Sequence, residues 1–210
     1  MEAIENYILS HISPEDEYLH QLYRATNLHL LRPRMASGHI QGSLLKMLTA
    51  LLQPKNVLEI GTFSGYSSLC IASALREESK LYTFEINDEQ EDFTRKWIDN
   101  SPYKNRIEFV IGDVLQLLPK YEISFQMAFI DGNKREYKQY YDIIFPKIEL
   151  GGLIIFDNTL WSGRVVDEQY KDSQTNSIRT FNDFIATERR VESVIIPIRD
   201  GLTLLRKIHE

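Results

Sequence analysis

The chain contains very little cysteine: among its 210 residues there is one, Cys70. A single thiol cannot form an internal disulfide, so the fold has to be stabilised by its packed core. A chain of this length can bury roughly 70% of its unfolded surface, which is enough for such a core. The neighbours Leu69, Ile71 and Ala72 are apolar. We therefore expect Cys70 to fill space inside the protein.

Long apolar runs and an excess of positive charge are also absent. No run approaches the ~20 residues that span a bilayer, and the N-terminus lacks a signal-peptide pattern. Lys and Arg together number 24 against 30 Asp and Glu, which gives a net charge of -6. Domains that bind nucleic acid usually carry clustered basic residues. We therefore expect a cytoplasmic protein with a small-molecule partner, and neither a nucleic-acid nor a membrane partner.

Helical periodicity fills the first fifty residues, and strands alternate with helices beyond Pro54. In the second helix, Ser13 is the expected N-cap, Pro14 the first helical residue and Asp16 the capping-box acid. The expected helices cover 2–11, 14–31, 38–52, 66–77, 88–99, 134–148 and 176–187, and the expected strands 56–60, 80–85, 106–111, 125–130 and 152–156, with a short turn at 114–118. This alternation predicts a parallel sheet covered by helices on both faces.

The C-terminal part has a different pattern. Apolar runs at 191–198 and 202–208 flank Asp200-Gly201, which predicts a hairpin and an antiparallel last strand. The polar segment 158–174 is longer than ordinary connections, so it is a candidate lid. No repeat or linker divides the chain. We expect one domain over 1–210, with a helical cap at 1–53 and a sheet core at 54–210.

The segment from Val57 to Ser67, VLEIGTFSGYS, is the most informative part of the chain. It reads as a buried strand, then a glycine turn that opens a helix, which is typical of a nucleotide-type cofactor site. Its spacing is G-x-x-x-G, whereas dinucleotide sites need G-x-G-x-x-G. Glu59 precedes the turn and would repel a phosphate. The pattern instead favours S-adenosylmethionine, which has a cationic amino-acid end and a nucleoside end.

An acid also ends the second predicted strand. Glu85 follows the apolar run 81–84 and lies twenty-four residues after Gly61. A carboxylate at this position can accept hydrogen bonds from the two hydroxyls of a ribose. This pair of acids around the glycine turn strengthens the prediction of a nucleoside-containing cofactor.

Oxygen-bearing side chains follow the next two central strands. Asp131 ends the strand at 125–130, and Asp157 with Asn158 ends the strand at 152–156. Strand neighbours lie about 4.8 Å apart, so the two carboxylates would repel each other unless a proton or a cation lay between them. Two Asp and one Asn favour a hard divalent ion such as Mg²⁺, with Mn²⁺ or Ca²⁺ as alternatives.

Lys134 lies three residues beyond Asp131, at the start of the next predicted helix. A metal ion and a helix N-terminus are both positive neighbours, and they would favour the neutral form of this lysine. The neutral amine can act as a general base, so Lys134 is the candidate catalytic residue. Weaker candidates are His39, Tyr140, Trp161 and Arg164.

These motifs together resemble the metal-dependent class I O-methyltransferases of the caffeoyl-CoA and catechol group, in particular the small bacterial members. The resemblance covers nearly the whole chain. It is carried by four motifs: Gln41-Gly42, the segment 57–67, Phe129-Ile130-Asp131, and the segment 157–163, DNTLWSG.

The resemblance implies a Rossmann-like α/β fold whose seven-stranded, mostly parallel sheet has the order 3-2-1-4-5-7-6. It implies methyl transfer from S-adenosylmethionine to a small aromatic vicinal diol, within a homodimer. The metal ligands would be Asp131, Asp157 and Asn158, and the catalytic lysine Lys134. The implied cofactor contacts are Ser37, Glu59, Gly61, Thr62, Ser67, Glu85, Asp113, Val114 and Asp131.

Two departures from the family pattern leave the substrate open. The segment 35–40 lacks the acid that commonly precedes the Gln-Gly pair, and residues 132 and 133 are Gly and Asn where the catechol enzyme has an aromatic gatekeeper. No basic residues near the N-terminus match those that recognise coenzyme A in the plant enzymes. A non-catalytic S-adenosylmethionine-binding module and a methyltransferase for another hydroxyl remain alternatives. A nicotinamide-dependent oxidoreductase is disfavoured by the glycine spacing.

Overall fold

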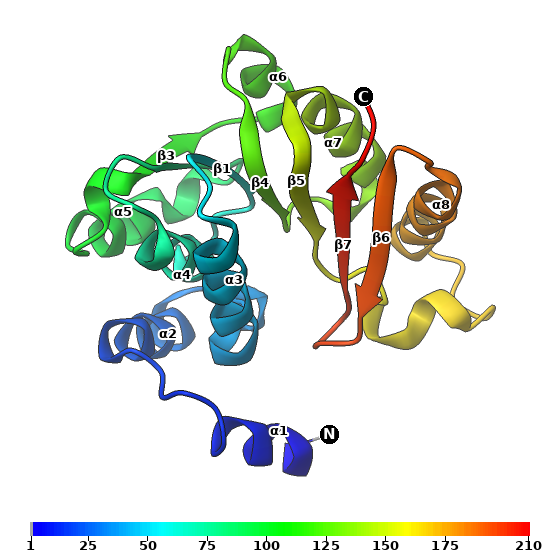
Figure 1. Ribbon diagram of the computed structural model, residues 1–210. Coiled ribbons are helices and arrows are strands. Elements are labelled where there is room, and N and C mark those ends of the chain that lie inside the picture. Colours follow the sequence, from blue (N-terminus) through cyan, green and yellow to red (C-terminus); the bar gives the residue numbers. More distant parts are fainter. Residues whose placement is uncertain (1) are drawn as a thin grey trace.

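The computed structural model describes residues 2–210 and is built around one seven-stranded sheet (Figure 1). The strand order is β3-β2-β1-β4-β5-β7-β6, as predicted. All pairings are parallel except those of β7, which is antiparallel to both β5 and β6. The strands are β1 (Asn56–Ile60), β2 (Lys80–Glu85), β3 (Ile107–Ile111), β4 (Phe125–Ile130), β5 (Ile148–Phe156), β6 (Val191–Ile196) and β7 (Leu202–Lys207).

Helices cover both faces of this sheet (Figure 1). The side chains of the central strands alternate between the two faces: Leu58 and Ile60 of β1 pack in one apolar cluster, and Val57 packs in the other. The first cluster is covered by α6 (Val114–Leu117), α7 (Tyr137–Ile144) and α8 (Ser173–Thr187), and the second by α2 (Glu17–His29), α3 (Gly38–Leu52), α4 (Tyr66–Ala74) and α5 (Glu91–Asp99). Burial on both faces explains why the strands are nearly continuous apolar runs.

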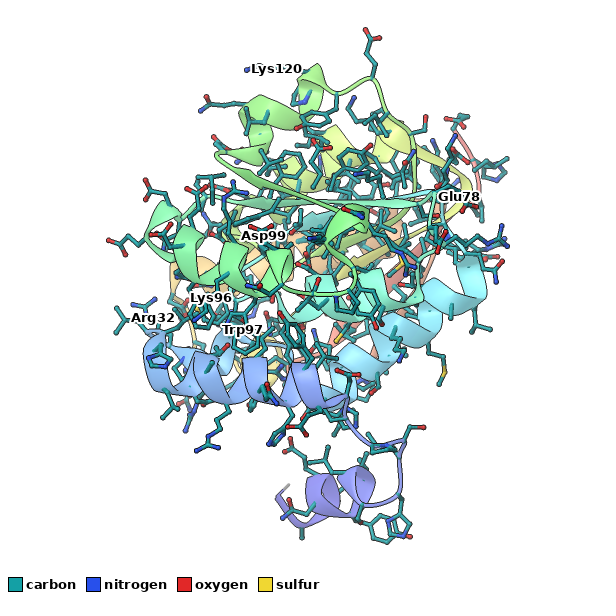
Figure 2. All side chains as sticks on the ribbon, turned by 90° about the vertical axis from the view of Figure 1, so that its left-hand side faces the viewer. Arg32, Glu78, Lys96, Trp97, Asp99 and Lys120 are labelled. Carbon is teal, nitrogen blue, oxygen red and sulfur yellow. The ribbon has the colours of Figure 1, made fainter. Side chains whose placement is uncertain are left out.

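The first helices extend this second layer. Tyr18 of α2 donates a hydrogen bond from its hydroxyl to the carbonyl of Trp97 in α5 (2.6 Å), and the two rings meet edge to face. Figure 2 shows α2 running beside α5, with Arg32 just beyond the end of α2. By contrast the ribbon of α1 (Glu2–Leu9) lies outside the two helical layers in both views. No helix within residues 2–210 combines the length and apolar character that a membrane crossing needs.

Cys70 lies in the second layer, on α4. It is 2% exposed and unpaired, as predicted. Burial raises the pKa of its thiol, which keeps the reactive thiolate form scarce. Cys70 therefore serves the packing of α4.

Several predicted element boundaries were wrong. The second helix begins at Glu17, and Asp16 is its N-cap, accepting hydrogen bonds from the amides of Tyr18 (2.9 Å) and Leu19 (3.4 Å); Ser13 and Pro14 precede the helix. β5 begins four residues earlier than predicted, at Ile148. The long polar segment after β5 contains a 3₁₀ helix, η7 (Trp161–Val166), and α8 begins at Ser173, so the segment is more ordered than predicted.

The carboxyl ends of the four central strands lie in register at one edge of the sheet. Ile60 of β1 is aligned with Phe84 of β2 and with Ile130 of β4, and Ile130 is aligned with Phe156 of β5. Backbone hydrogen bonds continue just past the strands, from Gly61 N to Phe84 O (2.9 Å), Asp131 N to Ile60 O (2.8 Å) and Asp157 N to Ile130 O (3.0 Å). The residues that follow these strands therefore converge at the topological switch point, where open α/β sheets bind ligands.

Candidate functional site

The glycine turn after β1 brings two strand ends unusually close together. Gly61 has a φ of +97°, and a Cβ placed on it would lie 2.5 Å from the carbonyl oxygen of Asp131. No side chain fits at that distance, so a glycine is needed for the ends of β1 and β4 to meet. Gly65, with a φ of 85°, then caps the start of α4. The turn leaves open space above the ends of β1 and β4.

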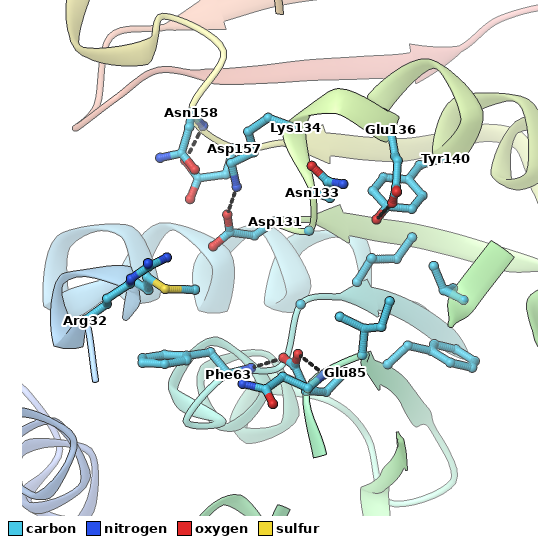
Figure 3. Close-up of a pocket in the computed structure, with 18 of the residues that line it drawn as sticks. Arg32, Phe63, Glu85, Asp131, Asn133, Lys134, Glu136, Tyr140, Asp157 and Asn158 are labelled. Atoms are coloured by element: carbon cyan, nitrogen blue, oxygen red, sulfur yellow. Dashed lines mark hydrogen bonds and ion pairs between the residues drawn. The ribbon is translucent and has the colours of Figure 1, made fainter. Parts of the chain in front are cut away.

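A cavity of about 660 Å³ occupies this space (Figure 3). Its size lies within the usual range of small-molecule sites. The cavity brings together many of the residues predicted from the sequence. Those that line it are Gly61, Glu85, Asp113, Val114, Asp131, Lys134, Asp157 and Asn158.

Glu85 is held by backbone amides at the cavity wall (Figure 3). Its Oε2 accepts a hydrogen bond from the amide of Phe63 (2.8 Å), and its Oε1 accepts one from the amide of Asn87 (2.9 Å). Each carboxylate oxygen can accept a further bond. The carboxylate is thus fixed in place and keeps capacity to accept further hydrogen bonds.

Glu59, in contrast, does not line the cavity; it is fully buried beneath the glycine turn. Its Oε2 accepts hydrogen bonds from the hydroxyls of Ser68 and Thr83, while its Oε1 has no partner. Burial raises the pKa of Glu59 to about 7, although hydroxyl donors, including that of Ser67, act to lower it. The described contacts of Glu59 connect β1, β2 and α4 under the turn.

Asp131, Asp157 and Asn158 meet at the ends of β4 and β5, as the strand register requires (Figure 3). Asp157 is 3% exposed; its Oδ2 accepts a hydrogen bond from Gln41 Nε2 (2.6 Å) and its Oδ1 one from the amide of Asn158 (2.6 Å). Asn158 has a φ of 55°, in the left-handed region that asparagine adopts more readily than most non-glycine residues. All three side chains offer oxygen atoms.

The two carboxylates repel each other inside this partly dry site. Burial, and then the charge of Asp131, raise the pKa of Asp157 to about 7, against lowering by Gln41 and Lys134. Lys134 is 8% exposed, and its Nζ lies 2.5 Å from Asp131 Oδ1. The pair leaves one oxygen of Asp131 free. The site therefore concentrates negative charge around a single buried amine.

The remaining predicted residues lie in four different places. Ser37 and His39 line a second cavity between the N-terminal helices, and His39 Nε2 lies 2.8 Å from the carbonyl of Ser13. Thr62 and Ser67 are buried near Glu59. Of the weaker candidates, Tyr140 and Trp161 line the main cavity, whereas Arg164 does not and lies over the ring of Tyr170.

Sequence reasoning assigned no role to several residues that the fold brings to this site. Gln41 was singled out only as part of a family motif. It is fully buried and donates a hydrogen bond to Asp157, which is 116 residues away in sequence. Arg32, Arg34 and Arg199 line the cavity mouth as well. The single local signal was the Gln41-Gly42 pair, and nothing in the linear sequence connects Arg199 with residues 32–34.

Comparison with known proteins points to one reaction class. A family model described as O-methyltransferase matches residues 9–208. Caffeoyl-CoA O-methyltransferase 2 of Petunia hybrida is 33% identical over 221 aligned residues, which cover 99% of this chain and 91% of the Petunia protein. Caffeoyl-CoA O-methyltransferase of Stellaria longipes is 28% identical, and the alignment again covers 99% of this chain and 91% of the relative.

Solved structures are similar over nearly the whole fold. The O-methyltransferase TomG from Streptomyces achromogenes, solved in complex with SAM, has a TM-score of 0.89 and 27% identity, covering 98% of this chain and 96% of TomG. The O-methyltransferase from Bacillus cereus, solved in complex with SAH, has a TM-score of 0.90 and 26% identity, covering 98% of this chain and 97% of the Bacillus chain.

Proposed function

This chain belongs to the O-methyltransferase family, and from that premise we propose that it transfers a methyl group from S-adenosylmethionine to one hydroxyl of an aromatic vicinal diol, assisted by a divalent cation. Family membership gives the reaction class. The diol is supported by the relatives' acceptor, because a caffeoyl group carries two adjacent ring hydroxyls. The cation is supported by the chemistry of the site.

One observation carries the proposal: the in-register ends of β4 and β5 place Asp131, Asp157 and Asn158 in the same cavity as Lys134 and Glu85. Residues that would hold an acceptor and residues that would hold a nucleoside thus share one space. Two reactants bound side by side can react without a covalent enzyme intermediate.

S-adenosylmethionine, when bound, supplies the methyl group on a positively charged sulfur. Glu85 would accept hydrogen bonds from its ribose hydroxyls, because backbone amides fix the carboxylate at the cavity wall. Asp113 and Val114, beyond the end of β3, would border the adenine, and Asp131 would face the amino group. Gly61 also lines the cavity, so its backbone would border the methionine portion.

The residues present fit a divalent cation. Within residues 2–210 no three His, Cys, Asp or Glu side chains are grouped so as to hold a metal ion; with Asp131 and Asp157 as ligands, the amide oxygen of Asn158 would be the third protein ligand. All-oxygen sets favour Mg²⁺. A cation held here would relieve the repulsion between the carboxylates and would supply positive charge that acidifies and orients a hydroxyl.

Lys134, in its neutral form, would take the proton of the reacting hydroxyl. Its Nζ is buried at the cavity wall and is already held beside Asp131. A base positioned in this way needs no help from the thiol of Cys70, which lies in the core.

A screen of diphenols tests the proposal. Release of S-adenosylhomocysteine should be seen with catechol and 3,4-dihydroxybenzaldehyde, and not with resorcinol or phenol, because only adjacent hydroxyls can bind one cation together. A chelator should stop the reaction and Mg²⁺ should restore it. Cofactor binding without methylation of any diol would favour a non-catalytic module. Equal turnover of resorcinol in the presence of the chelator would contradict the cation-assisted mechanism.

Gln41 gives a second test of the cation site. Gln41→Leu removes the Nε2 donor that is 2.6 Å from Asp157 Oδ2, so the pKa of Asp157 should rise further and its charged form should become scarcer. We expect Mn²⁺ affinity, measured by calorimetry, to fall about 10- to 100-fold, as is typical when a partner of a metal ligand is lost. The control is Gln21→Leu, since Gln21 also donates to a carboxylate, but on the exposed surface of α2. Equal affinities in both variants would contradict this role.

A further inference from the structure

Three arginines converge at the mouth of the cavity, and we call them the arginine rim. Arg32 and Arg34 come from the segment between α2 and α3, and Arg199 comes from the turn between β6 and β7. In Figure 3, Arg32 lies at the end of the pocket opposite Glu136 and Tyr140. Asp131 and Asp157 of the cavity come from the sheet edge, whereas the arginine rim comes from two loops, in one of which Asp200 follows Arg199.

The arginine rim carries positive charge that the described residues do not neutralise. Within residues 2–210 no ion pair involves Arg32, Arg34 or Arg199, whereas Arg95, Arg190 and Arg206 each have a carboxylate partner. The chain as a whole has a net charge of -6, with 30 acids available. Most arginines of the described chain have no ion pair, so what distinguishes these three is that they lie together on one cavity wall, where they favour an anionic ligand.

Arg199 fixes the shape of the rim. Its guanidinium donates hydrogen bonds to the carbonyls of Arg34 (3.0 Å), Ala36 (2.8 Å) and Ser37. The segment that carries Arg32 and Arg34 is thereby tied to the β6–β7 turn, although more than 160 residues separate them in sequence. The adjacent Asp200 accepts a hydrogen bond from Ser162 (2.9 Å), which ties the loop after β5 to the same turn.

Backbone strain also concentrates at this cavity. Seven non-glycine residues of the described chain have a positive φ, and five of them line the cavity: Arg32, Phe63, Asn158, Trp161 and Arg199. Such conformations cost about 1–3 kcal/mol each and persist where the surrounding structure imposes them, often at functional sites. Two of the three rim arginines are in this set, which supports a role in binding.

We propose that the arginine rim is a subsite for a carboxylate on the methyl acceptor, so that the preferred acceptors are anionic aromatic diols. The inference rests on the proposed function. The acceptor's diol would lie at Asp131, Asp157 and Asn158, its ring beside the apolar side chains of Met35 and Trp161, and its carboxylate at Arg32 and Arg34. The planar guanidinium group matches the geometry of a carboxylate.

The test compares an anionic acceptor with a neutral one of the same ring, 3,4-dihydroxybenzoate and its methyl ester. Wild type should prefer the benzoate, and the preference should shrink as salt is added. The double variant R32Q/R34Q should lose about tenfold or more in kcat/KM for the benzoate and less than about twofold for the ester, as expected when charge-assisted hydrogen bonds are removed. Arg199 is kept, because it also holds the backbone.

The matched control is Arg164→Gln, because Arg164 is an exposed arginine of the neighbouring loop that does not line the cavity. Arg164→Gln should leave kcat/KM unchanged for both acceptors. Equal losses for benzoate and ester in R32Q/R34Q would overturn the proposal, since the arginines would then only support the segment. A raised KM for S-adenosylmethionine with the acceptor preference intact would overturn it too, by assigning the arginines to the carboxylate of the donor.

Calorimetry of the two acceptors on cofactor-loaded protein separates this inference from the proposed function. One outcome is that neither acceptor is methylated, the benzoate binds more tightly than the ester, and R32Q/R34Q removes this difference in affinity. The proposed reaction is then wrong and the carboxylate subsite is supported. If both are methylated and bind equally in wild type and variant, the reaction stands and the subsite is wrong.

Discussion

Replacing Lys134 with methionine should lower kcat by about 10²- to 10⁴-fold, the contribution that general base catalysis typically makes. Methionine keeps an unbranched chain of similar length and removes the only amine that lies beside Asp131 in the described cavity wall. Lys134→Arg should be nearly as damaging, because a guanidinium keeps the positive charge but cannot give up its proton. The measurement is single-turnover methylation of a diol with saturating cofactor and Mg²⁺.

The matched control is Lys138→Met, four residues further on. Lys138 is exposed and pairs with Asp142 through 2.7 Å contacts on the surface of α7, so its loss should leave kcat unchanged. Calorimetry with S-adenosylmethionine and with Mn²⁺ shows whether a slow variant still binds both. If Lys134→Arg retains most of the turnover, Lys134 serves as a fixed charge for Asp131 and some other group accepts the proton.

The sheet and the convergence of its strand ends could be predicted from sequence because both depend on short, strongly apolar segments. β1 and β4 are buried on both faces, so their runs leave little freedom in placing the strands. Once the order is known, the residue after each strand is at a defined edge. Asp131 and Asp157 therefore came together as predicted, as did Glu85 at the cavity wall.

The direction of individual side chains was harder to predict from sequence than the strands themselves. Glu59 lies two residues before Gly61, on the same face of β1 as Val57, and so it points beneath α4 and not into the cavity. The two-residue period of a strand indicates which face Glu59 lies on. The hydrophobic pattern alone does not reveal that the hydroxyls of Ser68 and Thr83 donate hydrogen bonds to a carboxylate on that face.

Contacts between segments far apart in sequence could not be predicted. Arg199 reaches the backbone at Ser37, and Gln41 reaches Asp157, through packing of loops and of α3 against the sheet edge. Neither contact has a local pattern, because each depends on where whole elements come to rest. The same applies to the start of α2, where Asp16 caps the helix and Ser13 was the stronger candidate by sequence.

Gly61→Ala should both destabilise the fold and disable the site. The substitution places a Cβ 2.5 Å from the carbonyl oxygen and 2.8 Å from the carbonyl carbon of Asp131, on a residue whose φ is +97°. The positive φ costs about 1–2 kcal/mol, and forcing an extra carbon into a packed region adds about 1–3 kcal/mol. We expect the free energy of unfolding, measured in urea, to fall by the sum of both costs. Calorimetry should show weaker binding of S-adenosylmethionine and Mn²⁺, because Asp131 has to move.

Gly151→Ala separates the two costs. Gly151 also has a positive φ, +84°, but a Cβ there meets nothing within 4 Å, and the residue is exposed in β5 at a position that does not line the cavity. The free energy of unfolding of this variant should fall only by the cost of the positive φ, and its affinity for the ligands should be unchanged. Since the two substitutions share the backbone penalty, any excess loss in Gly61→Ala measures the contact between the ends of β1 and β4. If the two variants are equally stable and bind cofactor equally well, that close contact is not what positions Asp131.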